Sequence, residues 1–254
     1  MSINLTLLKS LIKSELPRVD FYGFESVDST STFLKSKARD TKQAVCIANE
    51  QIEGYGQRQR SWISDKDSIT FSLLYSSNIP VSESNGLAQY IGARLCHLLN
   101  SVCSHDVLIK WPNDLFTLDG KIAGLLIESC GSFDDHSSYI VGIGINLSDL
   151  TEVVSSNYAV SFLTPKVPLE KFVVLIIQNI MSSLECFMSR QYDELCLLFS
   201  KYDYFKKGQN VFLYDSGHKI TAEYEGVSSD GLVCLHIDNK KRCFHSGETS
   251  IRAK

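Results

Sequence analysis

Apolar positions before residue 204 follow two patterns. Short runs rich in β-branched and other apolar residues are typical of strands. A spacing of three to four residues, as at Leu87, Ile91, Leu95 and Leu98, predicts a helix with one buried face. From the first pattern we expect strands at residues 43–49, 70–75, 107–111, 124–128 and 139–143.

Helices are predicted in four places. Residues 1–20 fit a short amphipathic helix closed by Pro17, and residues 29–39 fit a helix capped by Asp28 or Ser29. The stripe described above predicts a helix at 87–99. A long helical stretch runs from Pro168, a suitable first-turn residue, to about residue 199. Its expected buried face is formed by Phe172, Leu175, Ile176, Ile180, Leu184 and Phe187.

The pattern changes after residue 204, where short strand-like segments are separated by turn residues. The segments are 209–215, 219–226, 231–237 and 241–245, with Ser-Gly, Ser-Asp-Gly and Asp-Asn turns between them. Regular turn signals of this kind predict a small β-barrel. We therefore expect two domains that pack together, at 1–204 and 205–254.

Composition and charge narrow the class of protein. Of 254 residues, 44% are hydrophobic and 21% charged, which excludes wholesale disorder. The net charge of −4 gives no global attraction to nucleic acid or to an anionic membrane. The densest apolar run, 173–177, is far shorter than the ~20 residues of a membrane span. The N-terminus lacks the order of a signal peptide, so we expect a cytoplasmic protein.

The eight cysteines show no pairing that indicates a disulfide framework or a zinc site. No C-x-x-C motif is present, and most of the cysteines lie in apolar stretches such as 45–47 and 233–235. A thiol in such a stretch behaves as a small hydrophobic group. We expect reduced, structural cysteines.

Residues 49–62 form the first segment with candidate chemistry. Gly54, Gly56, Arg58, Arg60 and Trp62 directly follow a predicted strand. Glycines let backbone N–H groups approach an anion, arginines bind phosphate through planar forks, and a tryptophan can close over a ligand. A solvated surface loop is the alternative, since neither a Walker motif nor G-x-G-x-x-G is present.

A second segment combines Lys110-Trp-Pro-Asn-Asp114 with Asp119-Gly-Lys121. The Leu-Asp-Gly-Lys sequence predicts a tight hairpin, which places Lys121 at the start of the returning strand. A lysine held there can neutralise a carboxylate and a phosphate together. The alternative is an ordinary surface lysine.

Two further segments are weaker candidates. Residues 141–147 alternate glycine with apolar residues and end near Asn146, which indicates that a ligand or another backbone lies against the strand. A tight sheet crossing would explain the glycines equally well. Residues 27–31 contain Asp-Ser-Thr, which at the start of a helix is more often a cap than a site.

The order and spacing of these segments resemble the biotin protein ligase family over about residues 21–252. The shared motifs are D-S-T, Q-x-x-G-x-G-x-R-x-R-x-W, K-W-P-N-D, K-x-x-G and G-x-G-I-N. The resemblance implies an α/β (α+β) fold, with a mixed-sheet catalytic domain and a C-terminal SH3-like β-barrel. This agrees with the boundary expected near residue 205.

The family reaction implied by the resemblance has two steps. Biotin and ATP with Mg²⁺ give biotinyl-5′-AMP and pyrophosphate, and a specific lysine of a carrier domain then attacks the adenylate. The implied partner is the biotin carboxyl carrier protein of acetyl-CoA carboxylase, with no membrane and no metal ligated by the protein itself. Both monomers and homodimers fit.

The resemblance also implies roles for individual residues. Lys121, Arg58 and Arg60 correspond to catalytic groups, and Lys121 contacts both the biotin carboxylate and the α-phosphate. Implied biotin-binding residues are Ser29, Thr30, Gln51, Gly54, Gly56, Lys121 and Gly124. Implied ATP- or adenylate-binding residues are Gln57, Arg58, Arg60, Trp62, Asn113, Asp114, Asn146 and Arg252.

The chain departs from the family pattern in the glycine-rich loop. The usual G-R-G-R-x-x-R-x-W has lost two arginines, replaced here by Tyr55 and Gln57. A charge-assisted hydrogen bond contributes ~1.5–3 kcal/mol, so we hypothesise that biotinyl-5′-AMP is held less tightly than in relatives. Arg58 is an alternative source of the lost charge.

The second departure concerns DNA. Only some twenty residues precede the catalytic pattern, too few for the winged-helix domain that many bacterial relatives carry. We therefore expect no DNA binding and no repressor function.

Three other functions compete with biotin ligation. Lipoate ligases share the fold and the adenylate chemistry but lack the K-W-P-N-D pattern. A non-catalytic biotin sensor would explain the missing arginines, but the presence of Lys121, Asn113, Asp114 and Asn146 argues against it. An SH3-like peptide binder has the least support, because no acidic and aromatic loop is clustered in the C-terminal part.

Overall fold

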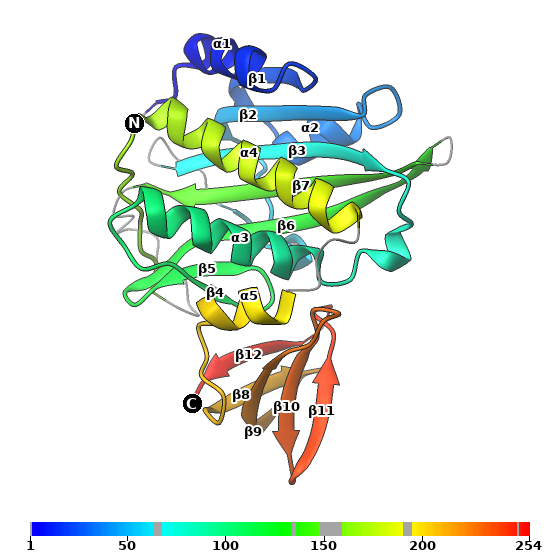
Figure 1. The fold of residues 1–254 in the computed structure, drawn as a ribbon, viewed down its shortest axis with the longest axis vertical. Helices are drawn as coiled ribbons and strands as arrows, with labels where there is room; N and C mark the ends of the chain where they lie inside the picture. Colours follow the sequence, from blue (N-terminus) through cyan, green and yellow to red (C-terminus); the bar gives the residue numbers. More distant parts are fainter. Residues whose placement is uncertain (1, 63–67, 134–135, 148–158, 190–194, 248) are drawn as a thin grey trace.

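The structure, a computed structural model, describes residues 2–62, 68–133, 136–147, 159–189, 195–247 and 249–254. Its larger part is built on a seven-stranded sheet, and a smaller five-stranded sheet formed by the end of the chain lies beside one edge of it (Figure 1). Together they give a mixed α/β fold.

The large sheet is mixed, in the order β1-β2-β3-β7-β6-β5-β4. Only β1 and β2 are parallel to each other, and the other neighbours pair antiparallel. The strands are β1 (Asp20–Val27), β2 (Gln43–Gln51), β3 (Ser68–Ser77), β4 (Leu108–Lys110), β5 (Asp114–Thr117), β6 (Gly120–Phe133) and β7 (His136–Asn146).

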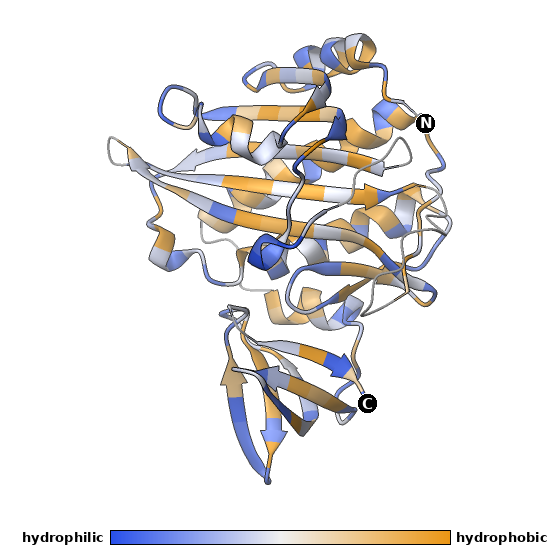
Figure 2. Ribbon diagram, turned by 180° about the vertical axis from the view of Figure 1, so that it is seen from behind, coloured by the Kyte–Doolittle hydropathy of each residue, from blue (hydrophilic) through white to orange (hydrophobic). Residues whose placement is uncertain are grey.

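The two faces of this sheet are covered differently. The long helices α3 (Leu87–Val102) and α4 (Leu169–Met188) pack against each other on one face, and α1 (Leu5–Glu15) packs against α4 (Figure 1). The opposite face carries the short helix α2 (Thr30–Lys35) and connecting segments (Figure 2). This more open face leaves room for a cavity over β6 and β7.

Helix α4 is long and apolar enough to cross a membrane by length and composition alone. In this fold its apolar side belongs to the core, where Phe172, Ile176 and Ile180 are fully buried. The predicted buried face is confirmed except at Leu175, which is half-buried. A core helix of a soluble protein passes the same test, so α4 is weak evidence for a membrane span.

The predicted elements are largely confirmed, with differences at their ends. Strands β6 and β7 extend well beyond 124–128 and 139–143, and the helix expected at 29–39 ends at Lys35. The stretch expected to be helical from 168 to 199 is α4 followed by α5 (Leu195–Tyr202), with residues 190–194 outside the described residues. Strands β1, β5 and β12 were not expected.

The C-terminal strands form an antiparallel sheet in the order β11-β10-β9-β8-β12. Closure of this sheet into an SH3-like barrel stays a prediction, as does the division of the chain at residue 204. The sheet is attached to the larger part by a hydrogen bond from the Trp111 indole to the Gly231 carbonyl, at 2.9 Å. The strands are β8 (Asn210–Asp215), β9 (His218–Val227), β10 (Val233–Ile237), β11 (Lys240–Phe244) and β12 (Ser250–Ala253).

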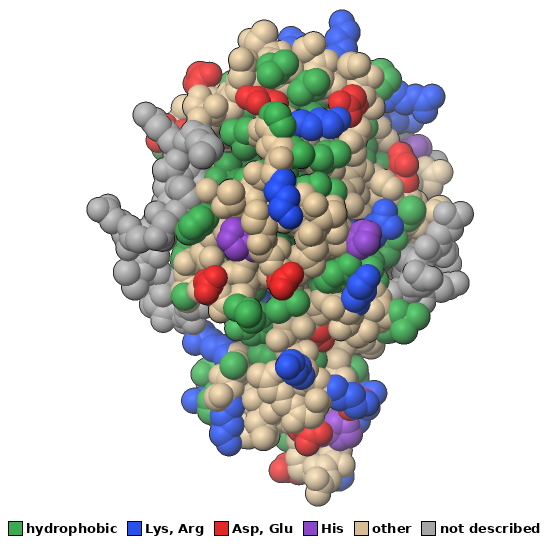
Figure 3. Space-filling view, turned by 60° about the vertical axis from the view of Figure 1, so that its left-hand side comes forward, with side chains coloured by type: hydrophobic (Ala, Val, Ile, Leu, Met, Phe, Trp, Pro, Cys, Tyr) green, Lys and Arg blue, Asp and Glu red, His purple; other side chains and the backbone are tan. Residues whose placement is uncertain are grey.

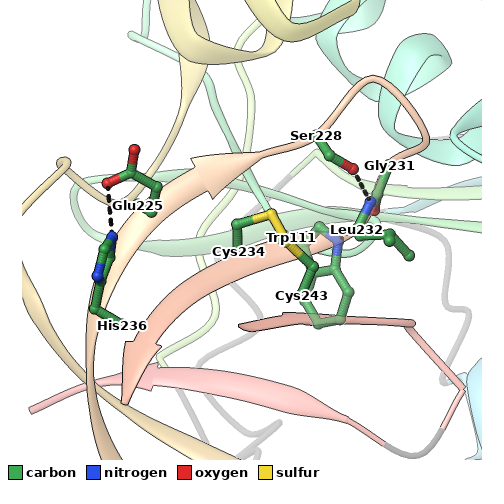
Figure 4. Close-up of a disulfide and its surroundings, with 8 residues drawn as sticks. All are labelled: Trp111, Glu225, Ser228, Gly231, Leu232, Cys234, His236 and Cys243. Carbon is green, nitrogen blue, oxygen red and sulfur yellow. Dashed lines mark hydrogen bonds and ion pairs between the residues drawn. A yellow bond between two sulfur atoms is a disulfide. The ribbon is translucent and has the colours of Figure 1, made fainter. Parts of the chain in front are cut away.

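The expectation that all cysteines are reduced is wrong for one pair. Cys234 and Cys243 form a disulfide across β10 and β11 (Figure 4). The antiparallel register places them directly opposite each other, with their Cα atoms 4.2 Å apart. Both residues are equally distant from the Asp238-Asn239 turn, and this symmetry was a signal in the sequence. The other six cysteines are free.

Candidate active site

A cavity of about 470 Å³ lies over the open face of the large sheet, between β6, β7, the 52–62 loop and the C-terminal sheet. Its walls bring together side chains from both parts of the chain. All predicted site residues line it except Gly54. They are Ser29, Thr30, Gln51, Gly56, Gln57, Arg58, Arg60, Trp62, Asn113, Asp114, Lys121, Gly124, Asn146 and Arg252.

One wall of the cavity is a network of uncharged polar groups. The Gln51 side-chain oxygen accepts hydrogen bonds from the backbone N–H and the hydroxyl of Thr30, at 2.8 and 3.0 Å. The hydroxyls of Thr30 and Ser31 each lie 2.8 Å from the Ser72 hydroxyl. This wall offers several donors and acceptors fixed by one another, which suits a polar, uncharged ring.

Ser29 serves two purposes in this wall. Its side chain caps α2 by accepting a hydrogen bond from the Thr32 N–H, at 3.3 Å, and it also lines the cavity. The cap interpretation of Asp-Ser-Thr is therefore confirmed, alongside a place in the cavity. Ser31 stood in a candidate segment without a predicted role, and Ser72 was not predicted. Ser72 lies between Phe71 and Leu73 in the buried part of β3, where a hydroxyl was the available signal.

A group of charged side chains lies elsewhere in the cavity. Lys121 Nζ is 2.6 Å from Asp114 Oδ1, and the two side chains are only 13% and 21% exposed. Lys110, also in the cavity wall, was missed as a site residue although it begins the K-W-P-N-D segment. Burial lowers the pKa of Lys110; Asp114 raises it, and the nearby charges of Arg252 and Lys121 lower it further. Lys110 thus feels the charges of both Lys121 and Arg252, and an excess of positive charge in the cavity favours an anion.

The predicted hairpin explains why Lys121 is held so firmly. Thr117 and Gly120 pair at the ends of β5 and β6, so the turn returns the chain immediately and places Lys121 near the start of β6. The backbone of Lys121 also exchanges hydrogen bonds at 2.8 Å with residues 159 and 161. The surface-lysine alternative is therefore wrong.

Trp62 lies against the glycines of the large sheet. A Cβ atom added to Gly144 would come within 2.2 Å of two carbons of the Trp62 ring, and one added to Gly124 would lie 3.2 Å from the ring. Gly144 of β7 and Gly124 of β6 therefore make room for an aromatic side chain, where we expected a ligand or another backbone. The indole N–H of Trp62 is buried and has no hydrogen-bond partner among the described residues.

Asn113 and Asn146 are buried supports of the cavity wall. The Asn113 amide donates to the Leu125 carbonyl, and the Asn146 amide donates to the Ser161 carbonyl at 3.1 Å. The first bond ties β6 to the segment before β5, and the second ties β7 to residue 161. Their amide N–H groups are thereby directed at the protein backbone.

The glycine-rich loop is closed on itself by backbone hydrogen bonds. The Gly54 carbonyl accepts a hydrogen bond from the Trp62 N–H at 2.8 Å. This bond places Gly54 at the base of the loop, outside the cavity lining. Arg58, with a positive φ of 59°, donates to the carbonyls of Gly247 and Thr249 at 3.1 and 3.3 Å. Its guanidinium therefore holds the loop to the backbone just before β12.

Comparison with known proteins shows what this chain is similar to. A sequence model of the biotin/lipoate A/B protein ligase family matches residues 23–146, which contain most of the cavity lining. This part of the chain is similar to that family. The chain is also similar to the bifunctional ligase/repressor BirA of Escherichia coli, which is 26% identical over 233 residues, or 89% of this chain and 72% of BirA.

Two other proteins resemble this chain, one in sequence and one in fold. The biotin–[acetyl-CoA-carboxylase] ligase of Paracoccus denitrificans is 33% identical over 124 residues, covering 48% of this chain and 52% of that protein. The crystal structure of the Aquifex aeolicus biotin protein ligase in complex with biotin and ATP has the same fold, with a TM-score of 0.76 and 22% identity over 92% of this chain and 99% of that one. The predicted resemblance to biotin protein ligases is confirmed; the roles of individual residues stay predictions.

Proposed function

We propose that this protein is an ATP-dependent biotin protein ligase. It activates biotin to biotinyl-5′-AMP with release of pyrophosphate, then transfers the biotinyl group to a lysine of a biotin carboxyl carrier protein. The observation that carries the proposal is the cavity itself, in which a fixed polar network and a cluster of cations around Lys121 face the same space. The similarity to biotin ligases supports the same activity.

The polar network is suited to the ureido ring of biotin. A ureido group offers two N–H donors and one carbonyl acceptor, so it needs both acceptors and donors in the wall. Ser29, Thr30, Gln51 and Ser72 supply these through hydroxyl and amide groups held in place by mutual hydrogen bonds. Burial of such a ring is favourable only when its polar atoms are hydrogen-bonded.

The cations are suited to adenylation. Attack of the biotin carboxylate on the α-phosphate brings two anions together, and Lys121, Lys110 and Arg252 offset their repulsion. Before substrate binds, Asp114 balances the charge of Lys121. Mg²⁺ is proposed to arrive with ATP as part of the substrate, and no cluster of three or more metal-ligating side chains is found among the described residues.

Transfer requires no nucleophile from the protein. A neutral carrier lysine attacks the acyl carbon of the adenylate, the amide bond forms, and AMP leaves. Burial raises the pKa of Cys46 to about 12 and that of Cys103 to about 11, which disfavours their thiolates, and the cavity lining contains no cysteine. The protein therefore positions two substrates and excludes water.

We also propose that this protein does not act on DNA. The net charge is −4, and over the upper part of the face in Figure 3 basic and acidic side chains are interspersed. Nucleic-acid binding usually depends on clustered positive charge. An electrophoretic mobility assay at low salt tests this point, and retarded DNA would contradict it.

The proposed function is tested by modifying a carrier domain. The protein is incubated with Mg-ATP, a biotin carboxyl carrier domain and either biotin or lipoate, and the carrier is analysed by intact-mass spectrometry. Mass gain equal to one biotinyl group, lost when the acceptor lysine is changed to Arg, supports the proposal. Modification by lipoate alone would assign the protein to the lipoate ligases, and binding of biotin without modification would indicate a sensor.

A further inference from the structure

Tyr55 belongs to a closed group of three polar side chains. Its hydroxyl donates to Glu128 Oε2 at 2.9 Å, and Lys35 Nζ donates to Glu128 Oε1 at 2.7 Å and to the Tyr55 hydroxyl at 3.0 Å. Each carboxylate oxygen therefore has its own donor. We call Tyr55, Lys35 and Glu128 the Tyr55 latch.

The latch joins three elements around the cavity. Lys35 is the last residue of α2, Glu128 lies on β6, and Tyr55 lies in the glycine-rich loop and lines the cavity. The Lys35 and Glu128 side chains are 36% and 21% exposed. Burial opposes the charge of Lys35, but its hydrogen bonds to Glu128 and Tyr55 outweigh that effect, and its pKa is raised. Charge-assisted hydrogen bonds with restricted solvent access are stronger than neutral ones.

Fixing Tyr55 fixes the rest of the loop. Tyr55 pairs with Ser61 as an antiparallel bridge, and the Gly56 N–H donates to the Arg60 carbonyl at 2.8 Å. The tip that carries Gln57 is therefore closed at its base by a segment that the latch holds. Arg58 holds the tip itself to the backbone just before β12.

Tyr55 stands where the family pattern has an arginine. A tyrosine cannot supply the lost charge to a ligand. Instead, its hydroxyl is hydrogen-bonded to Glu128 and Lys35. We propose that Tyr55 is a positioning residue, which tethers the glycine-rich loop over the cavity before substrate binds and so slows release of the adenylate. The second part of this inference rests on the proposed function; the tether does not.

Limited proteolysis tests the tether without any substrate. Trypsin cuts after Arg58 and Arg60, both exposed, and mass spectrometry measures cleavage at these two sites. Tyr55→Phe removes only the hydroxyl and is expected to raise the cleavage rate about tenfold. Lys35→Met is expected to raise it as well, and the double variant is expected to match the faster single variant because all three side chains act as one unit.

Two matched controls separate the tether from a general loss of stability. Tyr139→Phe removes a hydroxyl that donates to the Ile79 carbonyl at 3.0 Å, and Lys171→Met removes an ion pair with Glu15 at 2.8 Å. Neither residue lines the cavity, and neither control should alter cleavage in the loop. Equal cleavage of wild type and Tyr55→Phe would overturn the proposal.

Release of the adenylate tests the consequence for the reaction. Biotinyl-5′-AMP is formed on the enzyme from biotin and Mg-ATP, and its dissociation is followed after a chase. Tyr55→Phe should release it about tenfold faster and raise the KM for biotin, while kcat at saturating substrate changes less than twofold. An unchanged release rate would overturn this part. A wild-type protein that forms no adenylate would remove the proposed function, and the proteolysis result would still decide the tether.

Discussion

The ring of Trp62 and the backbone of Gly144 are in direct contact in the lining of the cavity. The contact is so close that a Cβ atom at Gly144 would lie 2.2 Å from the ring, well inside the distance that real atoms tolerate. Gly144 is on β7 in the middle of the large sheet, whereas Trp62 ends the glycine-rich loop. The sheet and the loop thus share one surface, and a change in either alters the cavity.

Gly144→Ala should weaken biotin binding by about tenfold or more without unfolding the protein. The added methyl must displace the Trp62 ring, and with it the end of the loop, although the backbone conformation of Gly144 is ordinary. Calorimetric titration with biotin measures the effect. In the Trp62→Ala background the same change should cost little, because the clashing ring is gone. Additive effects of the two changes would contradict this explanation.

Gln57→Arg should slow dissociation of biotinyl-5′-AMP. Gln57 is half-buried and lines the cavity, so an arginine there adds a charge-assisted hydrogen bond of ~1.5–3 kcal/mol, roughly ten- to a hundredfold in rate. Gln59→Arg is the matched control, because it adds the same charge to an exposed residue of the same short turn outside the cavity lining. The off-rate is measured by chase. Equal off-rates in Gln57→Arg and wild type would contradict the hypothesis.

Asp203 lies where the two parts of the chain meet, and it should make the free energy of unfolding depend on pH. Burial raises the pKa of Asp203 to about 7, against hydrogen bonds from the Tyr224 hydroxyl and the Phe205 N–H that lower it. The unfolded pKa is near 3.8, so the protonated carboxyl stabilises the fold fully below about pH 4, and this contribution is lost as pH rises to about 7.

Asp203→Asn provides the comparison for this pH dependence. Asparagine has the size of a protonated carboxyl but does not titrate. The free energy of unfolding of wild type relative to Asp203→Asn should therefore fall between pH 4 and pH 7, as measured by urea denaturation. Asp119→Asn, in an exposed turn, serves as control. A constant difference between wild type and Asp203→Asn over this range would contradict the predicted titration.

The helices and turns that could be predicted are those set by residues close together in the sequence. The stripe from Leu87 to Leu98 predicted α3, and the Leu-Asp-Gly-Lys turn predicted the hairpin that holds Lys121. Strand β1 escaped prediction because it lies at the edge of the large sheet and is partly exposed along its length, so its pattern is only weakly apolar. Strand β12 is short and becomes a strand by pairing with β8.

The candidate site was predictable as a set of residues but not as a set of contacts. Nearly every residue that motif spacing predicted lines the cavity, yet the spacing did not show that Trp62 covers Gly144 or that Arg58 binds the backbone just before β12. In the Tyr55 latch, Tyr55 and Glu128 lie 20 and 93 positions after Lys35 in the sequence. No local sequence pattern predicts contacts over such separations. Such contacts depend on tertiary packing.

Biotin-dependent release of pyrophosphate from Mg-ATP tests the central claim most directly, with Lys121→Ala compared against Lys171→Ala. Both changes remove a lysine from an ion pair, but Lys171 pairs with Glu15 outside the cavity lining. We predict release that requires biotin, persists in Lys171→Ala and falls at least a hundredfold in Lys121→Ala. No release by the wild-type protein, or release unaffected by Lys121→Ala, would contradict adenylation at this site.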